Sequence, residues 1–255
     1  MFIDTHAHLT FPEYKIDLAE VISRAKHANL EAIINIALDE QALSESLKLA
    51  EENPGYIYNA YGLHPQDAST WQESIAHKIR ALAKEKKIVA IGETGLDFYY
   101  KLSPVEKQAE VFRQFLHLAQ ELDLPAVIHS RDAARETMRI LHEENRGKLK
   151  GVFHCFSGDL DLAGEALDLG FLISFTGNIT FPKADKIRES AKMIPLDRIM
   201  IETDCPFLAP QDYRGKRNEP AYVVNVAEKI AEIRNLSVEE VAMNTAKNAR
   251  KLFNL

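Results

Sequence analysis

Short apolar runs alternate with amphipathic stretches along the whole chain. The apolar runs are rich in Ile, Val, Leu and Phe, which is typical of strands that are buried on both faces. We therefore expect eight strands, at residues 1–8, 32–37, 56–63, 88–92, 124–128, 150–153, 170–174 and 198–201. The amphipathic stretches predict helices at 15–28, 41–51, 69–86, 103–122, 132–144, 159–169, 183–193, 221–234 and 238–252.

This alternation predicts a fold. Eight strands that are each followed by a helix, in a chain of 255 residues, are typical of a (β/α)8 TIM barrel. A doubly wound open sheet is the rival fold, but it would carry a glycine-rich phosphate-binding turn after the first strand, and none is there. No glycine- or serine-rich linker divides the chain, so we expect a single barrel domain over residues 1–255.

Composition narrows the class of protein. A hydrophobic content of 46% and a charged content of 27% are those of an ordinary globular protein. No apolar run approaches the roughly 18 residues that span a bilayer, and the first residues do not resemble a secretory signal. Two cysteines, Cys155 and Cys205, provide no disulfide framework and are expected to pack in the interior. These features favour a cytoplasmic protein without membrane contact, and no separate dimerisation stripe is visible, so a monomer is expected.

The formal net charge of −7 argues against broad, charge-driven coating of nucleic acid. It does not exclude a nucleic-acid enzyme, because carboxylates gathered for metal binding make a site look acidic until the ions bind.

Polar residues with metal-binding side chains follow the expected strands. His6 and His8 are two positions apart, so in a strand they share a face and form half of a metal site. Glu93, His129 and His154 follow strands four, five and six, and Asp204 follows strand eight. A barrel gathers these strand ends at one mouth. The set fits two divalent ions bridged by one carboxylate, Glu93: His6, His8, Glu93, His129, His154 and Asp204.

Each residue also has a structural interpretation. A single histidine at a strand end is as often a satisfied core residue, but several together favour a metal site. Nitrogen and oxygen ligands suit Zn²⁺, Mn²⁺ or Mg²⁺. Asp4 is expected to accept a hydrogen bond from a ligand histidine, or simply to lie inside the barrel. Asp204 is expected to be the general base for the attacking water, and Glu202 an orienting carboxylate or a structural ion pair.

Several longer motifs resemble those of a known family over the whole chain length. They are Phe2–His8, Gly62–Pro65, Gly92–Tyr100, His129–Arg131, His154–Gly158, Glu202–Pro206 and the loop Tyr213–Pro220. In these motifs the chain resembles the TatD family of metal-dependent deoxyribonucleases, within the amidohydrolase-like barrels. The resemblance implies a cytoplasmic 3′-to-5′ exonuclease acting on single-stranded DNA, or RNA, with Mg²⁺. It also implies that the six residues above are the ligands, and a link of the family to deacylation of mischarged tRNA leaves that substrate as an alternative.

Substrate contacts are predicted around these ligands. Arg214, Lys216 and Arg217 place three cations in a loop beside the expected mouth, where they would hold phosphates or form a solvated loop. Tyr99, between Phe98 and Tyr100, would stack on a terminal base or pack internally. His64 and Arg131 are expected to bind the scissile phosphate, with His64 also in the catalytic set, and Asn218 to assist them.

Two rival functions remain at this stage. The same metals would serve an amide, ester or lactone hydrolase, and activity on DNA and on acyl substrates separates the two. A barrel that binds nucleic acid or protein without turnover is the second rival, and the complete ligand set argues against it.

Overall fold

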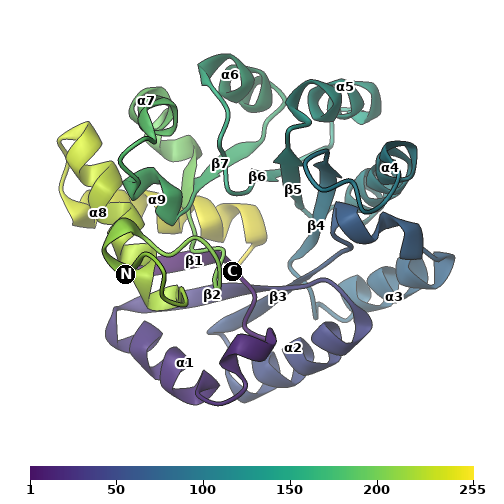
Figure 1. The fold of residues 1–255 in the computed structure, drawn as a ribbon. Helices are drawn as coiled ribbons and strands as arrows, with labels where there is room; N and C mark the ends of the chain where they lie inside the picture. The colour runs from purple at the N-terminus through teal and green to yellow at the C-terminus, as the bar shows by residue number, and fades with distance from the viewer.

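Eight parallel strands form the centre of the molecule, as the computed structural model of residues 1–255 shows (Figure 1). They are hydrogen-bonded in chain order, from β1 next to β2 through to β7 next to β8. The strands are β1 (Phe2–Ala7), β2 (Leu30–Ala37), β3 (Ile57–Tyr61), β4 (Ala90–Asp97), β5 (Ala126–Arg131), β6 (Gly151–Phe153), β7 (Leu172–Phe175) and β8 (Ile199–Ile201). The predicted (β/α)8 TIM barrel is confirmed.

Helices cover the outside of the strands (Figure 1). They are α1 (Leu18–His27), α2 (Glu40–Glu52), α3 (Glu73–Lys84), α4 (Val105–Leu122), α5 (Ala134–Glu144), α6 (Leu160–Asp168), α7 (Asp185–Met193), α8 (Val223–Arg234) and α9 (Val238–Phe253). The first and third helices begin later than expected, because the short 3-10 helices η1 (Pro12–Tyr14) and η2 (Pro65–Thr70) precede them. A proline opens each of these turns, since its fixed φ suits a first helical position. None of the helices combines the length and apolarity that a bilayer span requires.

Strand β4 extends beyond the end expected from its apolar run. Hydrophobicity stops at residue 92, but pairing with β5 continues to Asp97 opposite Arg131. Gly95 makes this pairing possible: its φ is +144°, and a Cβ at this position would overlap the carbonyl oxygen of His129. Consequently Glu93 and His129 lie within the last part of their strands rather than after them.

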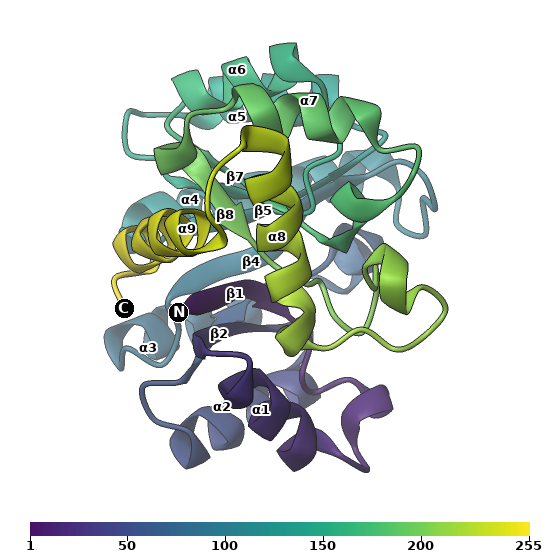
Figure 2. The same cartoon turned by 90° about the vertical axis from the view of Figure 1, so that its left-hand side faces the viewer.

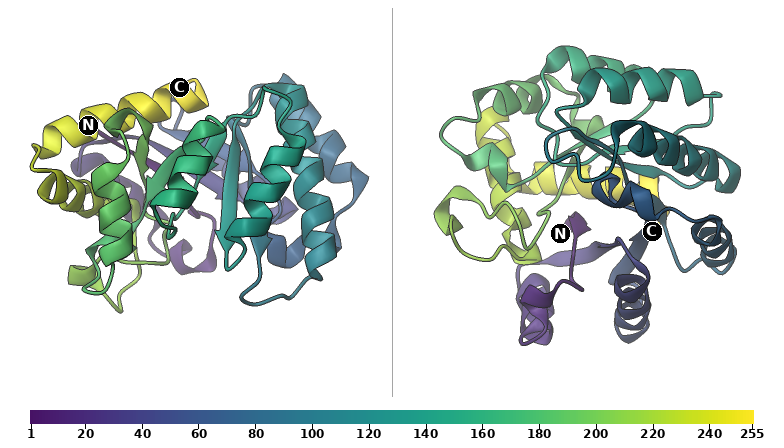
Figure 3. Two further views of the ribbon diagram at one scale, coloured as in Figure 1. Left: turned by 90° about the horizontal axis from the view of Figure 1, so that it is seen from above. Right: turned by 45° about the vertical axis from the view of Figure 1, so that its right-hand side comes forward.

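Two apolar cores hold the barrel together. The larger core fills the layer between the strands and the outer helices. The smaller core joins side chains such as Ile3, Ile34 and Val127 to Leu252 and Phe253 of α9. Helix α9 therefore packs against one end of the barrel, on the side of the two termini (Figures 2 and 3). The sequence predicts this helix but not its position as a plug.

Truncation of the plug is expected to destabilise the barrel. Phe253 is 2% exposed, so Phe253→Ala should remove about 3–5 kcal/mol from the free energy of unfolding. Met243 lies on the same helix but is 65% exposed, so Met243→Ala should change it by less than about 1 kcal/mol. Denaturant unfolding of both variants measures the difference, and equal effects would contradict a plugging role for α9.

Candidate metal centre

A cavity of about 670 Å³ opens at the carboxyl ends of the strands, where barrels of this class place their active sites. Its wall includes seven of the predicted site residues: His8, His64, Glu93, His129, Arg131, His154 and Asp204. We call the metal-binding residues at the bottom of this cavity the floor, and they are largely buried: Glu93 is 3% exposed. Buried carboxylates and imidazoles at this density require a partner that neutralises them.

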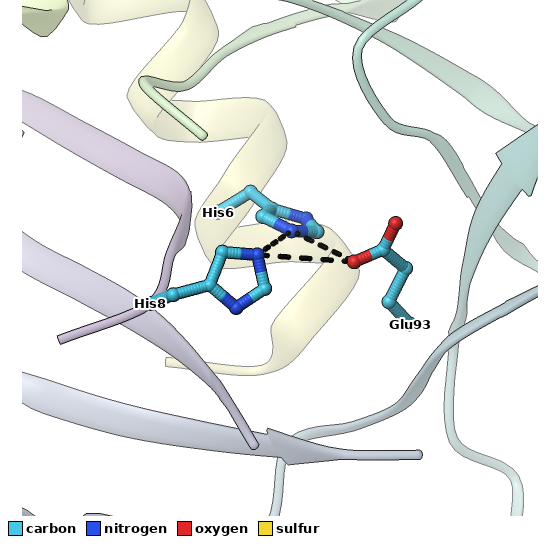
Figure 4. Close-up of side chains that lie close together, drawn as sticks. All are labelled: His6, His8 and Glu93. Carbon is cyan, nitrogen blue, oxygen red and sulfur yellow. Dashed lines mark hydrogen bonds and ion pairs between the residues drawn. The ribbon is translucent and has the colours of Figure 1, made fainter. Parts of the chain in front are cut away.

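The first group of donor atoms comes from β1, β4 and the segment after β8. His6 Nε2 lies 3.2 Å from His8 Nε2 and 3.4 Å from Glu93 Oε2, as Figure 4 shows for these three side chains. Asp204 Oδ1 lies 3.6 Å from His6 Nε2 and 3.5 Å from His8 Nε2. Ligands around a tetrahedral ion with bonds of about 2.1 Å are about 3.4 Å apart. His6, His8 and Glu93 therefore have the spacing of ligands that share one ion, and Asp204 lies at a similar distance from both histidines.

A second group meets the other oxygen of Glu93. Its Oε1 lies 2.6 Å from His129 Nδ1 and 2.8 Å from His154 Nε2, and these two nitrogens are 3.3 Å apart. His64 Nε2 is 3.9 Å from the same oxygen. Each oxygen of one carboxylate thus faces a different histidine pair, which is the arrangement of a carboxylate that bridges two ions.

Acceptors behind the imidazoles orient them. His8 Nδ1 lies 3.3 Å from the carbonyl oxygen of Ile36, and His129 Nε2 lies 3.3 Å from Asp97 Oδ2. His154 Nδ1 lies 3.3 Å from Glu202 Oε1. An acceptor at one ring nitrogen places the proton there and leaves the other nitrogen free to bind a metal. Glu202 stays a predicted orienting residue, because its contact with His154 Nδ1 has the distance of an ion pair but not the geometry of a hydrogen bond.

Electrostatics at the floor favour bound cations. Burial opposes the charge on Glu93, but the surrounding histidines, His154 foremost, hold its pKa well below its usual range. Burial likewise opposes ionisation of Asp204, while His8, His6 and His154 lower its pKa. Burial itself lowers the pKa of His6 and of His64. The carboxylates thus remain charged among imidazoles, and divalent cations would neutralise that charge in the same space.

The backbone places Asp204 with its carboxylate toward the histidines. Its φ is +56°, in the left-handed region that is uncommon for residues other than glycine and clusters at functional sites. Its amide donates to the carbonyl oxygen of His6 at 2.9 Å, which ties the segment after β8 to β1. Three of the residues together, His6, His8 and Glu93, form one of the clusters able to hold a metal ion. The donor types fit divalent metal ions.

Asp4 takes the second of the two expected positions, as a polar residue inside the barrel. Its carboxyl group accepts hydrogen bonds from the Thr203 amide at 2.9 Å and the His6 amide at 3.3 Å, and pairs with the Thr203 hydroxyl at 2.6 Å. It does not accept a hydrogen bond from a ligand imidazole, because Thr203 and the His6 amide use its two oxygens. Burial raises the pKa of Asp4 to about 8.

Two expected phosphate contacts in the loop after β8, Asn218 and Arg217, are already engaged within the fold. Asn218 is fully buried, and its amide group donates to the carbonyl oxygens of Thr203 at 2.9 Å and Phe207 at 2.6 Å. It therefore fixes the loop and is not free to assist a phosphate. Arg217 pairs with Asp17, with 2.6 Å between Nη2 and Oδ2, and lies over Tyr14, so it is also engaged within the fold.

The other two cations of that loop lie outside the cavity wall. The Arg214 guanidinium stacks 4.3 Å from the ring of Phe181, and Lys216 Nζ lies 6.0 Å from the ring of Tyr213. Arg214 and Lys216 stay predicted phosphate contacts, but only for a part of the substrate that extends outside the cavity.

On the opposite side, Arg131 and Tyr100 line the cavity, but Tyr99 does not. The Arg131 guanidinium lies 4.0 Å from the Tyr99 ring. Tyr99 therefore contacts this cation and does not itself reach the cavity. Cys155 also differs from expectation: its φ is +46°, not extended, and it lines the cavity. Cys205 is fully buried, as predicted.

Sequence reasoning missed Asp97, Phe11 and Phe207. Asp97 shares a strand face with Glu93 and Gly95, and this period of two could have identified it. The two phenylalanines lie in loops, where no periodicity applies, and both line the cavity.

Comparisons with known proteins identify the family of this chain. The model of the TatD related DNase family matches residues 3–254. An uncharacterized metal-dependent hydrolase of Bacillus subtilis, YabD, is 45% identical over all of both chains. A protein of Erwinia tasmaniensis named 3′-5′ ssDNA/RNA exonuclease TatD is 36% identical over 99% of both chains. The crystal structure of the TatD homolog YJJV from Escherichia coli K12 superimposes with a TM-score of 0.92 at 32% identity, covering 100% of this chain and 98% of that one.

Proposed function

The chain belongs to the TatD family of metal-dependent hydrolases, and on this premise we propose that it shortens single-stranded DNA, and RNA, from the 3′ end. The single observation that carries the proposal is the position of Glu93, whose two oxygens face separate histidine pairs on the cavity floor. Two ions at that spacing suit in-line displacement at a phosphodiester. A relative named as a 3′-5′ ssDNA/RNA exonuclease supports the choice of substrate.

The floor residues have distinct roles in this proposal. His6, His8, His129 and His154 hold the ions together with Glu93 and Asp204. Two divalent ions, Mg²⁺ in our proposal with Mn²⁺ or Zn²⁺ as alternatives, would lower the pKa of a water molecule and neutralise charge on the phosphate. Asp204 is the general base that accepts the proton of that water, since 14% of its side chain remains exposed to the cavity. Glu202 keeps His154 oriented.

The wall residues hold the substrate. Arg131 presents a guanidinium to the cavity and is kept in place by the Tyr99 ring, so it is the natural partner of the scissile phosphate. His64 has one nitrogen engaged by the Gln66 amide at 3.2 Å and directs the other toward Glu93, beside the same phosphate. Both Cys155 and Cys205 are free thiols, which agrees with a cytoplasmic protein, and we propose that it acts as a monomer.

The test is degradation of a single-stranded DNA oligonucleotide labelled at its 5′ end. Protein stripped with a chelator should leave it intact, and added Mg²⁺ should produce a ladder that shortens from the 3′ end. Asp204→Asn protein purified in parallel excludes a contaminating nuclease. Intact DNA with Mg²⁺, Mn²⁺ and Zn²⁺ alike would refute the exonuclease and favour an amide or ester hydrolase, such as a deacylase of mischarged tRNA, on the same floor.

A further inference from the structure

Two aromatic walls face each other across the mouth of the cavity. In a closed barrel of eight strands, β4 and β8 are diametrically opposite. Tyr100 follows β4 and Phe207 follows β8, and both line the cavity. The cavity that both of them line has a volume of about 670 Å³, within the range of sites that enclose a small ligand.

The wall after β8 is apolar and firmly held. The ring of Phe207 meets Phe11 edge-to-face at 5.7 Å and 83°, and Phe11 in turn lies 4.8 Å from the ring of His8. The Phe207 amide donates a hydrogen bond to the backbone carbonyl oxygen of Asp204 at 3.0 Å. The carbonyl oxygen of Phe207 accepts a hydrogen bond from the side-chain amide of Asn218. The backbone is thus fixed on both sides, three residues from the proposed general base.

Phe207 is nevertheless 49% exposed. An aromatic ring left open to water on a fixed backbone gives up the stabilisation that burial would provide. Its ring packs on one side against Phe11, and its open face is free to be covered by a flat ligand in the cavity.

The facing wall has the complementary chemistry. Arg131 lies 4.0 Å from the Tyr99 ring and 5.0 Å from the Tyr100 ring, so this side offers a cation on an aromatic support. A nucleotide has an anionic phosphate and a flat, weakly polar base. The two walls match these two halves, with the phosphate toward Arg131 and the base toward Phe207.

We propose that Phe207, held by Phe11, is the platform on which the base beside the scissile bond stacks, and that it selects unpaired strands. The inference rests on the proposed nuclease function. Stacking needs a base with a free face, and in a duplex both faces are already stacked on neighbours. Because the contact exists before and during the reaction, it contributes to binding rather than to the chemical step.

The first test is kinetic. Phe207→Ala should raise KM for single-stranded DNA roughly tenfold to a hundredfold and leave kcat nearly unchanged, and Phe207→Tyr should restore KM. Met193→Ala, at an exposed apolar residue of α7, is the matched control and should change neither. A fall in kcat with constant KM would overturn the platform and indicate a structural effect on Asp204.

A substrate that lacks the base at the scissile nucleotide separates stacking from general damage. Wild-type protein should bind this abasic strand as weakly as Phe207→Ala binds the normal strand, and Phe207→Ala should lose nothing further. Additive losses would show that Phe207 and the base do not interact, and would overturn the inference.

A binding measurement does not depend on hydrolysis. Phe207→Trp in the Asp204→Asn background should lose fluorescence when single-stranded DNA stacks on the indole, whereas Met193→Trp in that background should not. The native Trp71 packs against Phe115 and supplies a constant signal. If the Trp variant is quenched but the wild-type protein never cuts DNA, the nuclease function is refuted and the platform is retained. If the Trp variant is not quenched, the platform alone is overturned.

Discussion

Asp204→Asn is expected to lower kcat on single-stranded DNA by about 10³-fold or more while the barrel stays folded. The Asp204 carboxylate lies 3.6 Å and 3.5 Å from His6 and His8, so it serves in the proposal both as a ligand and as the general base. Asparagine has nearly the same volume, but it carries no charge and accepts no proton from water at neutral pH. General base catalysis alone contributes about 10²–10⁴-fold, and weakened metal binding adds to the loss. The backbone bond from residue 204 to His6 is unchanged, so folding should persist.

A matched control exists at the end of β5. Asp132 also has a left-handed backbone, with φ of +52°, but its side chain is exposed and outside the cavity floor. Asp132→Asn should retain activity within about twofold. Initial rates with a 5′-labelled strand, and denaturant unfolding of both variants, give the comparison. An undiminished rate for Asp204→Asn would refute its assignment as the general base.

The order of the strands and the positions of the histidines and carboxylates at their ends could be predicted, because both follow from short-range sequence patterns. Apolar runs mark the strands, and barrel closure alone brings residues as distant as His6 and Asp204 together. The sequence could not fix how far each strand extends. Pairing of β4 with β5 continues past the apolar run because Gly95 permits close contact with His129, and this contact is a property of two strands together.

Errors concentrated where the chain is not regular. For Asp4 the sequence leaves two positions open, and only the structure shows that its carboxyl group pairs with Thr203 inside the barrel. Cys155 is expected to pack in the interior, but its left-handed backbone directs it to the cavity. Asn218 lies in a loop, where the type of a residue does not reveal whether its amide group is already used by neighbouring carbonyl groups.

The largest expected effect on metal binding is that of Glu93→Gln. Both carboxylate oxygens are used: Oε2 lies 3.4 Å from His6, and Oε1 lies 2.6 Å from His129. A glutamine offers one neutral oxygen ligand and places an NH₂ group, which does not bind metals, toward the other histidine pair. We therefore expect the number of tightly bound divalent ions per chain to fall from the proposed two to at most one, and hydrolysis to fall by about 10³-fold or more.

Glu202→Gln is the control for Glu93→Gln, because it removes a buried carboxylate that does not lie between the two histidine pairs. Glu202 is as buried as Glu93, but it lies on the far side of His154, near Nδ1, and accepts a hydrogen bond from the Cys155 amide. A loss at this orienting position should weaken metal affinity by about 10–100-fold without changing the number of ions. Calorimetric titration of stripped protein with Mn²⁺, together with elemental analysis, measures both quantities. His6, His154 and Glu202 form a cluster of their own, so loss of an ion in Glu202→Gln but not in Glu93→Gln would move the metal site to that side of the imidazoles.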